Sequence, residues 1–309
     1  MDLRTISKNI NTKGYIFKAL GRKGLLNWMN NEAYLSRLYE YEMGYRPDLN
    51  TPKTFNEKLQ WLKIHDQKEI YHTFSDKYRA KELIAERIGA SHVIPTLAVW
   101  KTAEEIDLSG LPETFVLKCN HDQGSVIVCR DKASFDLCAA KNKLAHCLKT
   151  KSFYGTREFQ YSGIEPVIIA EPFLTDKHSG AGGLSGLTDF KFYCFNGSPE
   201  FLYIGRGYTF DHSLKMDFYD LNFNVMPFYR TDYGRLGNDF ERPASFVQMV
   251  SIARELARDT YFVRIDLYDV GGTVFFSEFT LHPGSGFQHF VPEETDHVLG
   301  DKLKLPFEN

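Results

Sequence analysis

The sequence has few cysteines, and it lacks the close cysteine pairs that zinc sites and dithiol motifs use. No Cys-x-x-Cys spacing occurs, which predicts reduced and mostly packed thiols at Cys119, Cys129, Cys138, Cys147 and Cys194. No apolar run approaches transmembrane length, and the N-terminus has no apolar signal stretch. We therefore expect a cytoplasmic protein without a zinc centre.

The sequence also lacks a strong excess of one charge. It has 37 lysines and arginines against 40 aspartates and glutamates, a net charge of −3, which argues against a nucleic-acid partner. Residues 1–30 differ locally, because basic side chains alternate there with apolar and aromatic ones. This stretch is expected to be either a helical arm packed on the body or an amphipathic segment in peripheral contact with the inner face of a membrane.

Two catalytic signatures are missing as well. No Gly-x-Ser-x-Gly elbow is present, so an esterase-type serine nucleophile is not expected. The sequence also has no Asp-x-Asp, the motif with which many metal-dependent glycosyltransferases bind a nucleotide-sugar.

The chain has 309 residues, and 43% of them are hydrophobic, which is enough for one large lobe or two to three smaller lobes with real cores.

Local patterns predict a mixture of helices and strands. Thr54 followed by Glu57 is a capping-box pattern, which predicts a helix start. Ser75 is expected to cap a second helix that runs to Ile88, and a late amphipathic helix is expected over 245–260. Short apolar runs predict strands over 114–118, 125–129, 167–174, 189–195 and 200–206.

The most informative stretch is an acid-containing hairpin near the end of the chain. Two apolar runs flank Gly271-Gly272, which predicts antiparallel strands with a tight turn. Asp266 and Glu278 interrupt these runs, and an acid in an apolar strand is costly unless it is paired. We expect the two acids to share a divalent cation, Mg²⁺ or Mn²⁺, since both prefer carboxylate oxygens.

Two neighbouring features support an anion site beside that cation. The loop Pro283-Gly-Ser-Gly286 has glycines that would let backbone N–H groups approach an anion, and Arg264 adds a positive charge. The simpler alternative is a core hairpin with surface acids and a glycine-rich turn.

Five motifs, taken together, resemble one known family. They are Thr54-Phe-Asn-Glu-Lys-Leu-Gln-Trp61, Ser75-Asp-Lys-Tyr-Arg-Ala-Lys81, Phe115-Val-Leu-Lys-Cys-Asn-His-Asp122, Tyr154-Gly-Thr-Arg-Glu158 and Pro283-Gly-Ser-Gly286. They resemble the ATP-grasp superfamily, in the branch named for teichuronopeptide biosynthesis. The resemblance implies an α+β fold in which two lobes with antiparallel sheets clamp ATP, plus an N-terminal helical region. The implied segments are an arm (1–50), a helical and strand region (51–112), a small lobe (113–174) and a large lobe with the metal site (175–309).

The resemblance also implies roles for single residues. Nucleotide contacts would come from Lys118, Gly124, Ser125, Glu171, Phe173, Leu174, Asp189 and Lys191. Catalytic groups would be Arg264, Lys191 and Ser285, and metal ligands would be Asp266, Glu278 and Thr280. Substrate contacts would come from His121, Arg157, His282, Gly284 and Gly286. Many ATP-grasp enzymes have Glu-x-Asn at the second metal position, and here Thr280 replaces the asparagine with a weaker ligand.

The function that follows is an ATP-dependent carboxylate–amine ligase. An acyl phosphate would form from ATP, and an amine or amino acid would then be joined to a carboxylated sugar of a bacterial surface polysaccharide such as a capsule. A glycosyltransferase of polysaccharide biosynthesis and a non-catalytic binder of ATP or polysaccharide are the alternatives. The absence of Glu-x-Asn is the reason to retain the non-catalytic binder as an alternative. The oligomeric state is not predicted.

Overall fold

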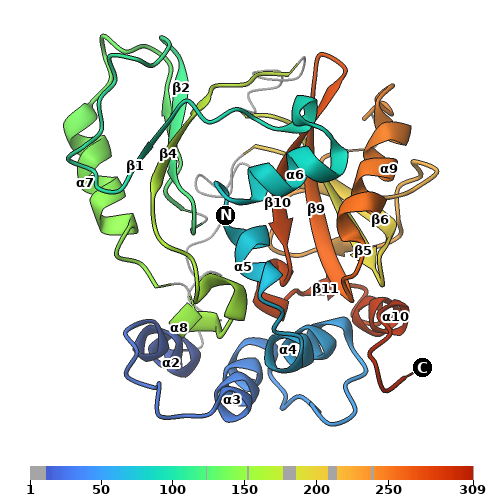
Figure 1. Ribbon diagram of the computed structural model, residues 1–309. Coiled ribbons are helices and arrows are strands. Elements are labelled where there is room, and N and C mark those ends of the chain that lie inside the picture. Colours follow the sequence, from blue (N-terminus) through green and yellow to red (C-terminus); the bar gives the residue numbers. More distant parts are fainter. Residues whose placement is uncertain are drawn as a thin grey trace, which may run out of the picture.

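The structure is a computed structural model that describes residues 12–122, 124–151, 153–176, 186–207, 214–237 and 240–308. Two antiparallel sheets organise the chain (Figure 1). The small sheet has the order β1-β4-β2-β3, formed by Ala98–Trp100, Ile168–Pro172, Phe115–Cys119 and Ile127–Cys129. The large sheet has the order β10-β9-β5-β6-β7, formed by Thr273–Thr280, Phe262–Val270, Asp189–Phe195, Ser198–Arg206 and Lys215–Asp220. The expected α+β architecture with two antiparallel sheets is confirmed.

Helices cover both sheets. In the small sheet, α7 (Leu137–Cys147) packs on one face and shares its apolar core. The large sheet is covered on one face by α9 (Phe246–Ala257) and on the other by α4 (Phe55–His65) and α10 (Thr295–Lys302). A two-stranded ribbon, β8 (Tyr229–Arg230) and β11 (Phe290–Val291), lies beside this second face.

Strand alternation decides which side chains of the large sheet reach the site. Phe190, Phe192 and Cys194 of β5 join the core under α9. Because successive strand residues point to opposite faces, Lys191 lies on the other face of the sheet. On β10, Phe276 and Phe279 both join the α9 core, and the register shifts between Phe276 and Glu278. This bulge places one extra residue in the strand and turns Glu278 toward the second face.

The predicted local signals are largely confirmed. Thr54 caps α4 in a capping box with Glu57, and the Gly271-Gly272 turn joins β9 to β10 with positive φ at both glycines. The predicted late helix is α9. The single helix expected over residues 75–88 is wrong, because the chain forms α5 (Ile70–Ser75) and α6 (Ala80–Ile88) instead.

The break between α5 and α6 has a visible cause at Asp76. Its carboxylate accepts hydrogen bonds from the N–H groups of Tyr78 and Arg79, a local side-chain turn that competes with helix. In the same segment, the N–H of Lys77 donates to the Asn120 carbonyl of the small-sheet region rather than to a helical carbonyl. Ser75 therefore ends α5 rather than capping the following helix.

The N-terminal part forms a separate layer beneath the sheets (Figure 1). It contains α2 (Thr12–Arg22) and α3 (Asn31–Met43), which pack against each other and, in the case of α2, against α8 (Phe153–Thr156). Residues 1–11 of the predicted arm lie outside the described residues. Among the residues that the structure covers, no helix combines the length and apolar character that a membrane crossing requires. The boundaries of the lobes stay a prediction.

Candidate active site between the two sheets

The two strand acids lie opposite each other. Asp266 of β9 and Glu278 of β10 are direct cross-strand partners, and the bulge before Glu278 creates this pairing. Asp266 is 0% exposed, whereas Glu278 is partly exposed. The juxtaposition expected from the hairpin is therefore present, and it combines one buried and one accessible carboxylate.

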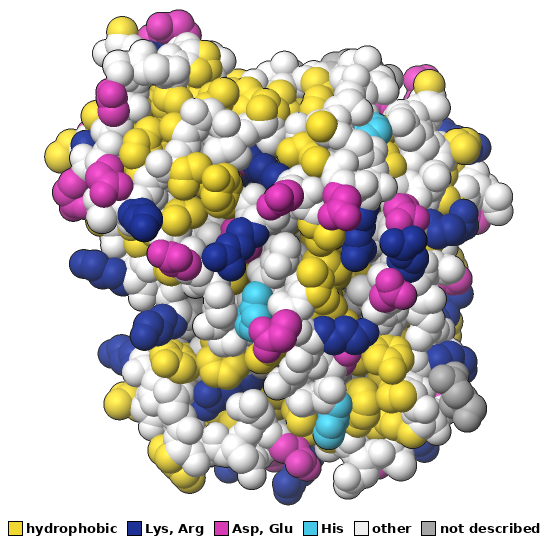
Figure 2. All heavy atoms as spheres, in the orientation of Figure 1, with side chains coloured by type: hydrophobic (Ala, Val, Ile, Leu, Met, Phe, Trp, Pro, Cys, Tyr) yellow, Lys and Arg dark blue, Asp and Glu magenta, His cyan; other side chains and the backbone are white. Residues whose placement is uncertain are grey.

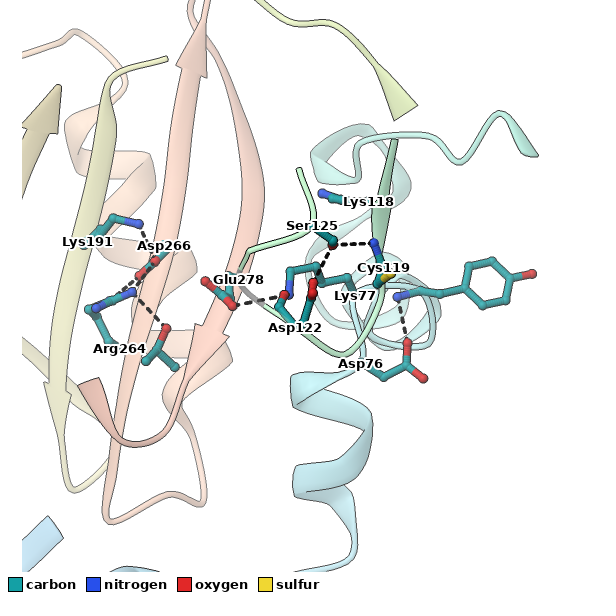
Figure 3. A network of polar contacts seen from close by, with 12 residues as sticks. Asp76, Lys77, Lys118, Cys119, Asp122, Ser125, Lys191, Arg264, Asp266 and Glu278 are labelled. Carbon is teal, nitrogen blue, oxygen red and sulfur yellow. Dashed lines mark hydrogen bonds and ion pairs between the residues drawn. The ribbon is translucent and has the colours of Figure 1, made fainter. Parts of the chain in front are cut away.

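Asp266 is surrounded by positive charge. Arg264 donates from Nε to Oδ1 and from Nη2 to Oδ2 of Asp266, both at 2.7 Å, and Lys191 Nζ lies 2.6 Å from Oδ2 (Figure 3). Burial acts to raise the pKa of Asp266, but the charges of Arg264 and Lys191 outweigh it and hold the pKa below its ordinary value. Asp266 is therefore an ionised buried carboxylate.

A second carboxylate completes this charge network. Lys191 Nζ lies 3.1 Å from Asp189, so it bridges two acids. Burial raises the pKa of Asp189, and the neighbouring charge of Asp266 raises it further against the opposing effect of Lys191. Lys191 itself has a pKa well above its usual range, because the two carboxylates outweigh the effect of its burial.

Thr280 sits on the same network. Its hydroxyl accepts a hydrogen bond of 2.9 Å from Arg264 Nη2, so Arg264 links the predicted metal ligands Asp266 and Thr280. Within the described residues, no group of three or more His, Cys, Asp or Glu side chains could by itself hold a metal ion. Two carboxylates still fit Mg²⁺, which typically takes its remaining ligands from water and nucleotide phosphates. The metal roles of Asp266, Glu278 and Thr280 stay predictions.

Across from this network, the small sheet presents a second charge cluster. Lys118 of β2 and Glu171 of β4 are diagonal neighbours, and Lys118 Nζ lies 2.5 Å from Glu171 Oε2. Lys81 of α6 reaches the other oxygen of Glu171 at 2.7 Å. Although burial acts to raise it, the pKa of Glu171 lies below its ordinary value because of these two lysines.

A small pocket joins this cluster to the large sheet. Lys118, Glu171 and Phe276 contribute to it, and its full lining is Lys77, Lys81, Val93, Ile94, Lys118, Glu171, Phe276 and Ser277. It therefore contains residues from the small sheet, from α6 and the segment before it, and from β10. Figure 2 shows charged side chains of both signs gathered across the middle of the molecule, between the regions of the two sheets.

Lys77 connects the two sheets directly. Its ammonium donates to the backbone carbonyl of Asp122 and lies 3.7 Å from Glu278 Oε1 (Figure 3). Sequence reasoning assigned no site role to Lys77 or Lys81, although both lie in the motif Ser75–Lys81. Their place in that motif is the signal that could have found them, since helical spacing does not apply at Lys77, between α5 and α6.

The turn after β2 is held by its own side chains. The Ser125 hydroxyl accepts from the Cys119 N–H at 2.7 Å and donates to the Asp122 carboxylate. Gly124 is exposed, and a Cβ there would meet nothing within 4 Å. His121 is buried beside the turn, and burial lowers its pKa. The nucleotide roles of Gly124 and Ser125, and the substrate role of His121, stay predictions.

The chain between the sheets carries the other predicted nucleotide contacts. Phe173 and Leu174 follow β4 directly and are half-buried. The guanidinium of Arg130 lies 4.9 Å from the centre of the Phe173 ring. Phe173 is thus fixed from the small sheet, and its contact with a nucleotide stays a prediction.

The Pro283–Gly286 loop is bound to α4. Gln60 and Lys63 donate to the Ser285 carbonyl at 3.0 and 2.7 Å. Gly284, Ser285 and Gly286 all have positive φ, and a Cβ at Gly286 would lie 2.4 Å from Gln60. The Ser285 N–H already donates to the His282 carbonyl at 2.8 Å. In this structure, that N–H is therefore used within the loop rather than directed at an oxyanion.

A buried polar cluster lies under the loop. Gln160 donates to Glu158 at 3.2 Å, and its amide nitrogen is 3.2 Å from His282 Nδ1. Burial raises the pKa of Glu158. The pKa of His282 lies well below its usual value, mainly because the ring is buried and also because the positive charge of Lys63 is near. His282 is therefore neutral, with its ring next to a polar amide.

Arg157 is part of the packing rather than of a surface loop. It is buried, its guanidinium lies 4.5 Å from the centre of the Tyr34 ring, and it donates to Asn27 and to the Leu26 carbonyl. Its predicted contact with substrate is untested, and its hydrogen bonds described here anchor the N-terminal layer.

Comparison with known proteins decides the family. A family model described as TupA-like ATP-grasp matches residues 57–304, which is most of the chain. The chain belongs to the TupA-like ATP-grasp family. This match, together with the two antiparallel sheets, confirms the expected ATP-grasp fold. No curated protein sequence matches the chain.

Solved structures of ATP-grasp proteins are similar to this family member at low identity. A D-alanine–D-alanine ligase from Bacillus anthracis complexed with ATP is 16% identical over 68% of this chain and 55% of that one, with a TM-score of 0.40. A D-alanine–D-alanine ligase from Helicobacter pylori is 15% identical over 76% of this chain and 59% of that one, with a TM-score of 0.43. A RimK domain ATP-grasp protein from Sphaerobacter thermophilus is 12% identical over 81% of this chain and 69% of that one, with a TM-score of 0.38. The chain therefore spans less than two thirds of the length of the two D-alanine–D-alanine ligases.

Proposed function

We propose that the chain is an ATP-dependent carboxylate–amine ligase. The observation that carries the proposal is the cross-strand pairing of Asp266 and Glu278. Arg264 and Lys191 both bind the carboxylate of Asp266, the buried acid of this pair. Lys118 adds positive charge across the pocket. Phosphoryl transfer needs little covalent help from a protein and depends on positioning and on charge stabilisation. A site with paired acids and several fixed cations suits that requirement.

Each group has a distinct proposed task. Lys118 and Lys81, held by Glu171, supply positive charge for the nucleotide phosphates from the small-sheet side. Asp266 and Glu278 would hold Mg²⁺ together with phosphate oxygens, and the ion would neutralise charge on the transferring phosphoryl group. Mn²⁺ has the same ligand preference and could substitute.

Two bonds exchange in sequence. In the first step, a substrate carboxylate oxygen bonds to the γ-phosphorus of ATP, and the bond to ADP breaks, which gives an acyl phosphate and ADP. In the second step, an amine nitrogen bonds to the acyl carbon, inorganic phosphate leaves with the electron pair of its bond to that carbon, and the amine loses a proton. Arg264, rigidly oriented by Asp266, stabilises the oxyanion that forms at the acyl carbon.

For the substrates, we propose a carboxylated sugar of a bacterial surface polysaccharide and an amine or amino acid. The resemblance to the teichuronopeptide branch supports this pair. The buried cluster of Glu158, Gln160 and His282 next to the Pro283–Gly286 loop offers polar groups of the kind that recognise hydroxyls or an amine. We propose that the reaction takes place in the cytoplasm, where ATP is available.

Product analysis tests the reaction. With a carboxylated acceptor, the purified protein should release ADP and phosphate, and no AMP. Without amine, hydroxylamine should trap the activated acid as a hydroxamate. Transfer of sugar from a UDP- or GDP-sugar without any need for ATP would replace the ligase by the glycosyltransferase alternative.

One observation favours a second candidate, a non-catalytic ATP binder. The Thr280 hydroxyl, which stands where many ATP-grasp enzymes have an asparagine amide, accepts a hydrogen bond from Arg264 at 2.9 Å. A binder should bind ATP with Mg²⁺ in isothermal titration and yet form neither hydroxamate nor ADP with any acceptor. Thr280→Asn should then raise Mg²⁺ affinity, because the amide carbonyl restores the usual ligand.

A further inference from the structure

Helix α2 packs on the body through its small residues. Gly14 and Gly21, seven residues apart and so on one side of the helix, are both buried. A Cβ at Gly21 would lie 2.0 Å from the Tyr34 hydroxyl, so this contact requires glycine. On the same side, Phe17 stacks on Tyr34 with ring centres 5.0 Å apart, and Lys18 pairs with Glu42 at 3.1 Å.

Several large apolar side chains of α2 and of the turn after it are nevertheless left outside. Trp28 is 80% exposed and Tyr15 is 71% exposed, the two highest values among the large hydrophobic residues that the structure describes. Ile16, Leu20 and Leu25 are exposed as well. A globular protein normally places such residues inward, and a contiguous exposed group of them indicates an interaction surface.

The charge of the same segment selects the partner. Residues 12–31 contain four basic residues and no acidic one, although the whole chain has a net charge of −3. Of the four, Lys13, Arg22 and Lys23 are exposed. In Figure 2, hydrophobic and basic side chains lie together at the lower left, where Figure 1 places α2. Exposed tryptophan, tyrosine and aliphatic side chains next to basic ones match the headgroup layer of an anionic bilayer.

We propose that residues 12–28 form a docking surface for an anionic phospholipid bilayer. The outer side of α2 and the turn after it would lie in the headgroup layer, with Trp28 and Tyr15 inserted and the basic side chains on lipid phosphates. The glycine contacts hold α2 against the body with its outer side already exposed. The proposal does not rest on the proposed ligase reaction, and its test does not depend on that reaction.

The experiment is vesicle co-sedimentation with the full chain. Vesicles of equimolar phosphatidylcholine and phosphatidylglycerol should bind the protein, and vesicles of phosphatidylcholine alone should bind it much more weakly. Each basic charge removed near the surface should weaken binding about fivefold, so that Lys13→Gln with Lys23→Gln should weaken it about 25-fold. Trp28→Ser should also lower binding, and the blue shift of tryptophan emission on vesicles should disappear with Trp28.

Matched controls come from other parts of the surface. Val247→Ser removes an apolar side chain that is 68% exposed on α9, and Lys101→Gln removes an exposed charge outside the segment. Both controls should bind vesicles like the wild type. The proposal is overturned if the wild type ignores anionic vesicles, if the controls lose as much binding as the segment variants, or if the segment variants instead abolish a dimer seen by light scattering.

Discussion

Replacement of Lys191 by methionine would test the metal site without removing either acid. Lys191 Nζ lies 2.6 Å from Asp266 Oδ2 and 3.1 Å from Asp189, so it occupies the space beside the oxygens that would bind a cation. Methionine keeps most of the unbranched stem and removes the charge. The variant then leaves Asp189 and Asp266 without their shared counter-ion, while Arg264 still holds Asp266 through two hydrogen bonds.

The magnitude follows from burial. Removal of one partner of a buried ion pair typically costs about 3–5 kcal/mol, and the remaining Arg264 favours the lower end, about 3 kcal/mol. At about 2–4 °C per kcal/mol, the melting temperature of Lys191→Met should fall by about 6–12 °C. Mg²⁺ should restore part of this loss, because a cation that binds only the folded variant stabilises it.

The assay is thermal unfolding in Mg²⁺ against NaCl of equal ionic strength. We expect a larger Mg²⁺ shift for Lys191→Met than for the wild type, where the ammonium competes with the ion. The matched control is Lys302→Met, which breaks a half-exposed pair with Glu200 at 2.8 Å and should cost no more than about 1 kcal/mol, without any Mg²⁺ effect. An Mg²⁺ shift in Lys191→Met no larger than that of the wild type would refute a cation site at Asp266.

Three further predictions concern other charged side chains of the structure. Lys118→Ala should weaken ATP binding in isothermal titration while the protein stays folded, because its ammonium supplies charge in the pocket beside Glu171; unchanged affinity would remove Lys118 from the nucleotide site. Asp266→Ala and Glu278→Ala should each abolish turnover, and the double variant should lose little more, since both serve one cation; additive losses would count against a shared site. Burial lowers the pKa of Lys63 to about 8 from 10.5, so the unfolded chain binds more protons between these values and folding stability should rise with pH there, by about 3 kcal/mol. Denaturant unfolding should show this rise, and it should be absent in Lys63→Met.

Local chemistry determined much of the fold from the sequence. Thr54 and Glu57 are only three residues apart, so a capping box could be predicted and is present. The Gly271-Gly272 turn and the strands around it depend on neighbouring residues as well, and they placed Asp266 and Glu278 on adjacent strands, although an unbroken register from that turn would pair Asp266 with Ser277. The motifs were sufficient to predict the ATP-grasp fold, because together they resemble one family, and that family's model matches the chain.

Only the tertiary structure decided which charges meet. Lys77 and Lys81 lie far in sequence from Glu171 and Glu278, and they reach them because Asp76 ends one helix and turns the chain before the next. The bulge before Glu278 depends on the packing of Phe276 and Phe279 under α9, which no local pattern specified.

The N-terminal segment shows the same division. Its composition indicated an amphipathic stretch, but two arrangements were open: a packed arm or a surface for a membrane. Packing resolved how the helix lies, because Gly14 and Gly21 allow close approach to the body and Tyr34 fills the space that a side chain would need. The sequence by itself determined which side chains this segment contains, and the close glycine contacts of α2 decided that Tyr15 faces outward.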